Sequence, residues 1–349
     1  MRFARKLPLA ALAAAALAAL PLLGAGCIYA PLDFGLGEIG KVQEVTLVES
    51  EARAKVLMLH IDGEINDEAS GGGLFGTTEG TTAQVKDVLD LARKDDSVVA
   101  LLLRINTPGG GVTASDIIYR EISAWKAETK KPVVALMMDT CASGGYYVSM
   151  AADRIVAHPT CITGSIGVIT MLPNVAGLAD KLGVEVVTIK SGSHKDMGSP
   201  FRAPTDEDRK LFQSLIDQMY GRFVDVVAAG RKGLAKDRIR QLADGRVYTA
   251  PEALQNKLID QIGYFEDALA AAKKLANVRD ARVVSYERKG LGSGRRTIYS
   301  SSFAEPVEAS LLARGGAEGD RNIVKIDARP LLPGASGPVF KYLWLPTIH

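Results

Sequence analysis

The sequence predicts an α/β fold in which a largely parallel sheet is built from repeated units of strand, glycine turn and helix. Apolar runs as long as a buried strand alternate with segments whose apolar residues recur at helical spacing. Two of the units also match each other, because 98–110 and 133–145 both begin with Val-Val-Ala-Leu and both end with Gly-Gly. Strands that alternate with helices form parallel sheets with helical cover.

The strands and helices follow one another in a simple order. Strands are predicted at 56–61, 98–105, 133–138, 154–158 and 184–190. Helices are predicted at 85–92, 115–126, 146–152 and 205–230, the last with Thr205 in its cap. Glycine-rich turns follow the last four strands. These turns are expected at the carboxyl edge of the sheet, where ligands bind in such folds.

The N-terminal segment differs from the rest of the chain. Three basic residues precede an Ala/Leu run at 7–23, and Gly-Ala-Gly-Cys closes the segment at Cys27. This pattern predicts an export signal at 1–27, with two alternatives: a signal peptide cut before Cys27, which then carries lipid, or an uncleaved membrane anchor. Both alternatives place the remaining chain outside the cytoplasm and tethered to a membrane.

Beyond this signal the chain is expected to have three parts. Residues 28–53 have the mixed composition of a linker, 54–276 form one main domain, and 277–349 form a C-terminal extension. The extension includes a Gly/Ser-rich stretch and closes with an apolar segment at 339–346. We expect this last segment to pack on the main domain.

The composition argues against several classes of function. The 42 Lys and Arg and the 40 Asp and Glu give a net charge of +2, and no basic block interleaves with aromatic residues, so nucleic acid is not expected as a partner. The three cysteines are too few, and odd in number, for a disulfide framework, and no Cys/His cluster has the spacing of metal ligands. No metal or other cofactor is expected.

A candidate nucleophile follows the strand predicted at 133–138. Ser143 stands where an apolar strand turns into a helix, which exposes a hydroxyl beside the unpaired N–H groups of the helix start. A serine in this place is more often only an N-cap in a tight turn. The neighbouring turns favour the catalytic alternative.

A nucleophilic serine needs a base that takes its proton. His60 and His158 each end an apolar strand, which is typical of packed or capping histidines. Lys195 lies in the loop after 184–190, and a lysine acts as a base when burial lowers its pKa; the alternative is a solvated loop lysine. Ser165 is a candidate for orienting such a lysine, with a plain turn serine as its alternative.

Acyl transfer also needs donors for an oxyanion, which backbone N–H groups supply best at glycine. Gly109 and Gly110 follow the strand at 98–105, and Gly144 follows Ser143. A Thr-Pro-Gly-Gly turn alone is common. Together with the serine and lysine turns, it predicts one site for hydrolysis.

Four motifs, taken in order, resemble those of the bacterial signal peptide peptidase A family, the S49 serine peptidases. They are Arg-Ile-Asn-Thr-Pro-Gly-Gly at 104–110, Ala-Ser-Gly-Gly-Tyr-Tyr at 142–147, Thr-Gly-Ser-Ile-Gly-Val at 163–168 and Lys-Asp-Met-Gly-Ser-Pro at 195–200. The resemblance runs from about 56 to 276, and it is to the short form of the family with one copy of the domain.

The resemblance implies a role for each candidate residue. Ser143 would be the nucleophile, Lys195 the general base, Ser165 the residue that orients the lysine, and Gly110 the main oxyanion donor. Lys190 competes with Lys195, because double-domain relatives take their lysine from a similar Tyr-Lys-Ser setting. The Lys-Asp-x-x-Ser-Pro context favours Lys195.

The resemblance further implies a fold similar to the Clp protease and crotonase superfamily and a membrane-anchored homo-oligomeric ring or dome. Its implied substrates are cleaved signal peptides and similar unfolded segments. In such an assembly Ser143 and Lys195 can come from neighbouring copies. The expected function is therefore a membrane-tethered serine endopeptidase with a Ser-Lys dyad, on the periplasmic side if the organism is Gram-negative.

Two other functions are compatible with the same fold. A crotonase-like acyl-CoA enzyme would use paired glycine turns to hold an enolate, but it would be cytosolic and would need neither Ser143 nor Lys195. A catalytically inactive membrane scaffold would keep the fold without the chemistry. The export signal argues against the first alternative, and the intact set of site residues argues against the second.

Overall fold

The computed structural model describes residues 42–344 apart from 69, 74–75, 289–296 and 300–339. The predicted export signal, with Cys27, lies outside the described residues. Among the helices that the structure describes, none combines the length and the apolar character needed to cross a lipid bilayer.

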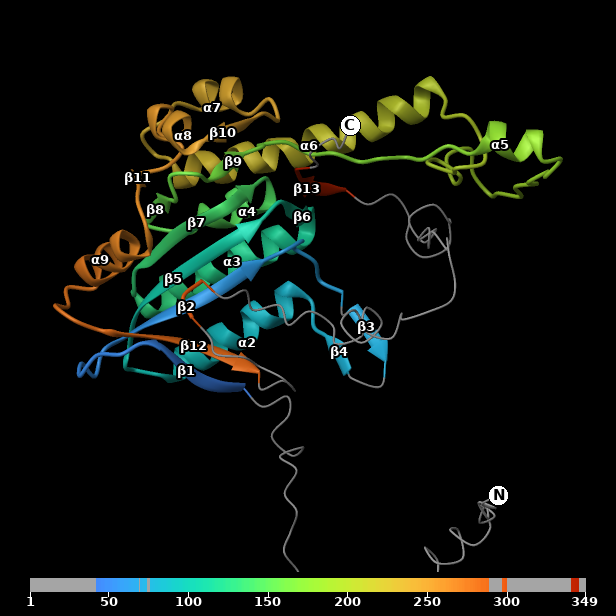
Figure 1. The fold of residues 1–349 in the computed structure, drawn as a ribbon. Coiled ribbons are helices and arrows are strands. Elements are labelled where there is room, and N and C mark those ends of the chain that lie inside the picture. Colours follow the sequence, from blue (N-terminus) through green and yellow to red (C-terminus); the bar gives the residue numbers. More distant parts are fainter. Residues whose placement is uncertain (1–41, 69, 74–75, 289–296, 300–339, 345–349) are drawn as a thin grey trace, which may run out of the picture. The chain divides into compact units, whose positions relative to one another are not determined.

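In the described residues, a nine-stranded sheet forms the centre of the fold (Figure 1). Its strands are β1 (Val42–Val48), β2 (Lys55–Asp62), β5 (Val98–Thr107), β7 (Val133–Ala142), β8 (Arg154–Ala157), β9 (Ile162–Gly164), β10 (Val247–Thr249), β11 (Gln261–Ile262) and β12 (Arg282–Arg288). They run in the order β1, β12, β2, β5, β7, β8, β11, with β9 beside the end of β7 and β10 beside β9. Only β1–β12 and β9–β10 are antiparallel among these pairs, so the expected α/β fold with a largely parallel sheet is confirmed.

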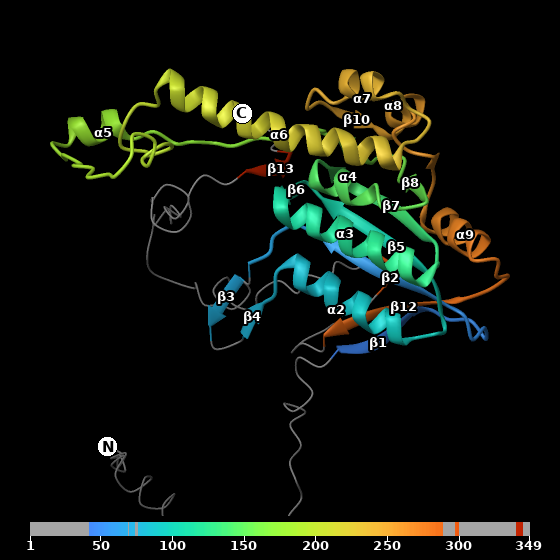
Figure 2. The ribbon, with the colours of Figure 1, turned by 180° about the vertical axis from the view of Figure 1, so that it is seen from behind.

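Helices cover both faces of the sheet, which explains why its strands are continuous apolar runs. In β2, Leu57 and Leu59 belong to a core cluster that includes residues of α2 (Thr81–Lys94) and α3 (Val112–Thr129). Val56 and Met58 point the other way, into a cluster with α9 (Phe265–Leu275). Figures 1 and 2 show the two helical layers from opposite sides.

The remaining elements lie around this core. The other helices are α4 (Gly144–Ser149), α5 (Ala176–Lys181), α6 (Asp206–Gly230), α7 (Lys236–Leu242) and α8 (Ala250–Gln255). Two further antiparallel pairs are β3 (Ser70–Gly73) with β4 (Gly76–Thr78), and β6 (Gly109–Gly111) with β13 (Lys341–Leu343). The second pair joins the glycine turn after β5 to a segment close to the C-terminus.

The two matching units of the sequence are neighbours in space. β5 and β7 each have ten residues and run in parallel, with Leu101 opposite Val133. Each strand leads through a glycine turn into a helix, α3 after β5 and α4 after β7. The predicted repeat is therefore confirmed, and it brings the two glycine turns to the same edge of the sheet.

The prediction of a strand at 184–190 is wrong. These residues form neither helix nor strand, and their side chains are exposed, with Val187 at 74% and Ile189 at 96%. Valine and isoleucine favour strands, but a strand also needs a neighbour that accepts its hydrogen bonds. No strand in the described residues pairs with this segment.

The sheet also extends past the expected limits of the main domain, 54–276. β1 lies within the expected linker at 28–53, and β12 lies within the expected extension at 277–349. β12 stands between β1 and β2 and pairs with both. Polar residues in β1 and β12 make their sequence pattern weaker than that of the central strands.

Helix α6 has two unlike halves. It begins as predicted, because the Thr205 hydroxyl accepts the N–H of Asp208 at 3.1 Å, and the Asp208 carboxylate accepts the N–H of Thr205 at 2.9 Å. The second half is buried through Phe223, Val224, Val226 and Val227. In the first half, Leu211 and Leu215 are exposed. Figures 1 and 2 show α5 beyond this first half, away from the sheet.

Candidate active site

Ser143 lies at the corner between β7 and α4. Its backbone has φ 52° and ψ −110°, a conformation that residues other than glycine rarely adopt, and the residue is 1% exposed. Its N–H donates to the carbonyl of Gly164 at 2.8 Å, and its carbonyl accepts from Tyr147 at 2.9 Å. Strained corners of this kind concentrate at functional sites, and here hydrogen bonds on both sides hold the strain in place.

The glycine turn after β5 touches this corner. Gly109 has φ 107°, and a Cβ atom built on it would lie 2.7 Å from the nitrogen of Gly144. A Cβ atom on Gly144 would lie 3.2 Å from the nitrogen of Gly110, and one on Gly110 would overlap the carbonyl oxygen of Ile65. The amides of Gly110 and Gly144 therefore lie close together beside Ser143, as an oxyanion site requires.

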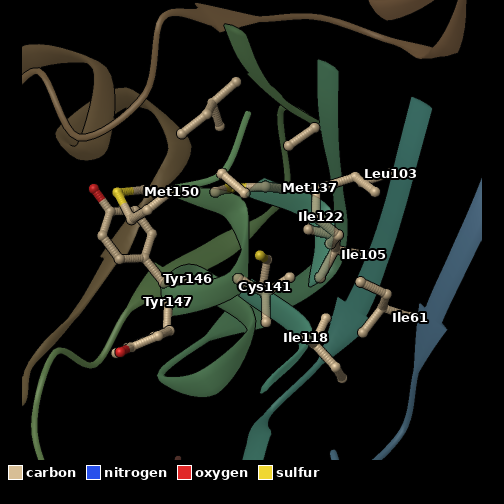
Figure 3. Close-up of a cluster of buried hydrophobic side chains, with 14 of the residues drawn as sticks. Ile61, Leu103, Ile105, Ile118, Ile122, Met137, Cys141, Tyr146, Tyr147 and Met150 are labelled. Atoms are coloured by element: carbon tan, nitrogen blue, oxygen red, sulfur yellow. The ribbon is translucent and has the colours of Figure 1, made fainter. Parts of the chain in front are cut away.

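The corner is fixed by the core beneath it. All six residues of α4 are buried. The Tyr146 hydroxyl donates to the carbonyl of Leu258 at 2.9 Å, and the Tyr147 hydroxyl donates to Asp116, which also accepts from Arg222 at 2.9 Å. Figure 3 shows Cys141 pointing into the apolar cluster, with Tyr146 and Tyr147 nearby. The nucleophile turn is thus held by packing on one side and by hydrogen bonds on the other.

Burial also governs the ionisation of the groups around Ser143. It raises the pKa of the Cys141 thiol well above its ordinary value. It likewise raises the pKa of the Tyr146 and Tyr147 phenols, and for Tyr147 the hydrogen bond to Asp116 adds to the effect. These groups therefore stay neutral around Ser143.

The segment β13 lies along the edge formed by β6. Tyr342 is opposite Gly110, and the backbone of Lys341 exchanges two hydrogen bonds of 3.0 Å with Ile169 on its other side. The Tyr342 side chain is fully buried; its ring lies 5.0 Å from that of Tyr147 and 4.6 Å from that of Phe223. Its hydroxyl donates to the carbonyl of Met219 at 2.9 Å. The expected packing of the C-terminal apolar segment is confirmed for 340–344, but its place beside Gly110 was not expected.

Ser165 lies next to the nucleophile turn. β9 pairs with the end of β7, with Gly164 opposite Ala142, and Ser165 follows directly with φ 49°. Its N–H donates to the carbonyl of Arg246 at 2.8 Å, which fixes its backbone. The structure therefore brings Ser143, Gly110, Gly144 and Ser165 together.

Lys195 is not part of this group within one chain. Its side chain is exposed and makes no hydrogen bond or ion pair with any described residue. The competing Lys190 is engaged, since its Nζ lies 2.8 Å from Asp196 and 3.0 Å from the carbonyl of Ser193. The segment between α5 and α6 that carries both lysines lies beyond the start of α6, away from α4 (Figures 1 and 2).

Two groups of polar residues near these segments were not anticipated. Asp116 and Arg222 come from α3 and α6, and nothing in their local sequence indicates that they meet at Tyr147. Arg202 bridges the lysine segment and α6 through Asp196 and Asp208. The sequence pattern of a helix cap that begins at Thr205 includes Asp208, but it does not indicate the contact with Arg202. In the described part of the chain, no three His, Cys, Asp or Glu side chains gather in a way that would hold a metal ion.

Comparison with known proteins decides the family. Residues 126–279 match the model of peptidase family S49. The chain is 39% identical to the "Putative signal peptide peptidase SppA" of Enterococcus faecium over 252 residues, which cover 72% of each chain. The chain belongs to peptidase family S49.

Two further relatives are longer than this chain. It is 36% identical to "Protease 4" of Haemophilus influenzae over 64% of its own length and 34% of that protein. It is 39% identical to "Serine protease SPPA, chloroplastic" of Arabidopsis thaliana over 56% of its own length and 28% of that protein. Membership of this family makes the chain a serine-type peptidase, and its sheet is consistent with the Clp protease and crotonase fold of S49 peptidases.

Proposed function

We propose that the protein is a serine endopeptidase in which Ser143 is the nucleophile and Lys195 of a neighbouring copy is the general base. The observation that carries this proposal is the buried, strained corner at Ser143, in contact with the glycine turn at Gly109 and Gly110. The exposed position of Lys195 within one chain favours a base shared between copies.

Each group has a defined task in the reaction. The neutral Lys195 amine takes the proton of the Ser143 hydroxyl as its oxygen attacks the carbonyl carbon of the substrate. The N–H groups of Gly110 and Gly144 stabilise the negative charge on the carbonyl oxygen. The C–N bond then breaks, the lysine ammonium gives its proton to the leaving amine, and water releases the acyl group by the same steps. Ser165 orients the lysine through its hydroxyl.

The substrates that we propose are cleaved signal peptides and similar unfolded segments. Lys341–Leu343 lies along β6 in antiparallel register, and we propose that a substrate binds as an extended strand in its place, a conformation that unfolded segments adopt readily. The place of Tyr342, beside the contacting rings of Tyr147 and Phe223, suits a large apolar or aromatic side chain of such a substrate.

A homo-oligomeric ring or dome at the membrane completes the proposal. The segment at 182–189 exposes Leu182, Val184, Val187 and Ile189, which another copy can cover. The segment at 1–27 would tether the assembly, with or without lipid on Cys27, and the peptidase domain would lie outside the cytoplasm.

Mixing two inactive variants tests the shared site. We expect Ser143→Ala and Lys195→Ala each to abolish peptide cleavage when expressed alone. Co-expression with random assortment should restore about a quarter of the sites (1/2 × 1/2), because some Ser143 residues then meet an intact Lys195 of a neighbour. A mixture that stays inactive would show that the dyad lies within one chain.

Labelling separates the peptidase from its alternatives. A fluorophosphonate should label Ser143 in the unmodified protein and should fail to label Lys195→Ala. An acyl-CoA enzyme or an inactive scaffold would not be labelled at Ser143. Near-normal turnover by Lys195→Ala would overturn the assignment of the base.

A further inference from the structure

Arg202 connects the lysine segment to the start of α6. Its guanidinium meets the Asp208 carboxylate through two hydrogen bonds, Nη1 to Oδ2 at 2.5 Å and Nη2 to Oδ1 at 3.2 Å. The same Nη2 donates to Oδ1 of Asp196 at 3.0 Å. Asp196 directly follows Lys195, so a single side chain joins the residue after the lysine to the helix.

The helix end of this connection is rigid. The Asp208 side chain is 2% exposed, and its carboxylate also accepts the N–H of Thr205 in the cap of α6. Its fixed position leaves little freedom to the guanidinium that it holds, since a forked pair of hydrogen bonds restricts both distance and orientation. The start of α6 therefore acts as an anchor for Arg202.

The other end of the connection has few alternative supports. Turns within the segment form backbone hydrogen bonds from Lys195 to Gly192 at 3.2 Å and from Met197 to His194 at 3.0 Å. Towards α6, the exposed His194 ring lies 3.6 Å from the Glu207 carboxylate. No residue from 182 to 195 is buried. Half-buried residues begin at Asp196, whose side chain is 10% exposed and is contacted by both Arg202 and Lys190.

The charges at Asp196 favour a lasting connection. Hydrogen bonds from Arg202 and then from Lys190 lower the pKa of Asp196 to about 2, so its carboxylate stays ionised in neutral solution. Two cations share this carboxylate, which leaves the Lys195 amine without a partner among the described residues. The contacts of Asp196 therefore hold the backbone next to Lys195, while the Lys195 amine is left to contact another copy.

We propose that Arg202 is a positioning residue, which holds the Lys195 segment on the start of α6 and so presents the lysine amine to Ser143 of the neighbouring copy. The proposal rests on the proposed function, because it assumes that Lys195 is the general base. Arg202 itself does not touch the reacting atoms.

The test compares two arginines at opposite ends of α6. Arg231, at the end of α6, forms a similar fork with Asp260, at 2.8 and 3.1 Å, and its side chain is 11% exposed, but it does not contact the lysine segment. We expect Arg202→Ala to lower kcat by about 10- to 100-fold with KM within about twofold, since misplacing a catalytic group affects the chemical step. Arg202→Lys should recover part of the loss, and Arg231→Ala should keep kcat within about twofold of the unmodified protein.

Rescue by an added amine tests whether the loss of kcat in Arg202→Ala arises from a misplaced Lys195. A small primary amine such as propylamine, added to Lys195→Ala, replaces the missing base without the loop. If Arg202 only positions the lysine, the rescued rates of Lys195→Ala and of Lys195→Ala with Arg202→Ala should agree within about twofold. A further loss of tenfold or more in the double variant would overturn the proposal.

The remaining outcomes separate the two proposals. Full activity of Arg202→Ala beside an inactive Lys195→Ala would overturn the positioning role and leave the dyad standing. An active Lys195→Ala would overturn the dyad itself. A loss in Arg202→Ala that follows a change in oligomeric state, measured by mass photometry, would also overturn the positioning role.

Discussion

The nucleophile corner and the lysine segment are built in opposite ways. Ser143 sits in a buried turn that is fixed by strands, a helix and hydrogen bonds on both sides. Lys195 lies in a segment whose apolar side chains are exposed and whose firmest attachment is an ion pair. The difference teaches that the fold of a single chain fixes the corner at Ser143, whereas the lysine segment exposes apolar side chains, which we propose that another copy covers.

Thiol reactivity should give the largest contrast between the two regions. Burial raises the pKa of the Cys161 thiol to about 12, and Cys141 is also fully buried. At about pH 8 we expect these thiols to react with iodoacetamide at least about 10³-fold more slowly than a cysteine introduced by Glu185→Cys, at an exposed residue of the lysine segment that we do not assign to the neighbour, because the thiolate is the reactive form. Mass spectrometry of labelled peptides measures both rates in the same sample, and comparable rates would contradict the packing described for the corner.

A substitution in the glycine turn should give the next largest effect, a loss of catalytic rate. Gly110→Ala places a methyl group against the carbonyl of Ile65, so the backbone that carries the oxyanion donor must shift. We expect kcat to fall by about 10²- to 10³-fold, the loss typical for a missing oxyanion donor. Gly192→Ala is the matched control, because a Cβ there meets nothing within 4 Å and the residue lies in the lysine segment. Equal activity of the two variants would contradict the role of Gly110.

Stability should also distinguish the regions. Phe223 is fully buried beside Tyr147, so Phe223→Ala should lower the free energy of unfolding by about 3–5 kcal/mol. Chemical denaturation followed by tryptophan fluorescence measures this change. A loss below about 1 kcal/mol would mean that the second half of α6 is not packed as described.

The smallest effect on folding is expected in the lysine segment. Ile189→Ser removes a side chain that is 96% exposed, so the free energy of unfolding should change by less than about 0.5 kcal/mol. The same variant should weaken association between copies, because it removes an apolar contact that we assign to the neighbour. Sedimentation velocity measures association. Unchanged association together with a large loss of stability would contradict both the exposed position of Ile189 and its contact with another copy.

Local patterns were sufficient to predict the central part of the fold. The apolar runs of β5 and β7 and their glycine turns follow from residues close in sequence, and so does the cap of α6 at Thr205. Ser143 was found for the same reason, because its strand-to-helix corner is a local feature. Whether Ser143, Lys195, Ser165, Gly110 and Gly144 act together stays a prediction.

Other features depend on residues that are distant in sequence. Residues 184–190 have the composition of a strand, but composition does not provide a neighbouring strand. Tyr342 meets Gly110 and Tyr147 across more than half of the chain, and Arg202 depends on where Asp196 and Asp208 come to lie. Such contacts are set by tertiary packing, and no local pattern predicts them.

The chemical nature of the nucleophile corner has a consequence for kinetics. Its proposed oxyanion donors are backbone amides, which do not ionise, and burial raises the pKa values of the Cys141 thiol and of the Tyr146 and Tyr147 phenols. None of these groups changes charge around neutral pH. The inflections of a pH–rate profile in that range therefore report on groups outside this set, among them the base that we propose.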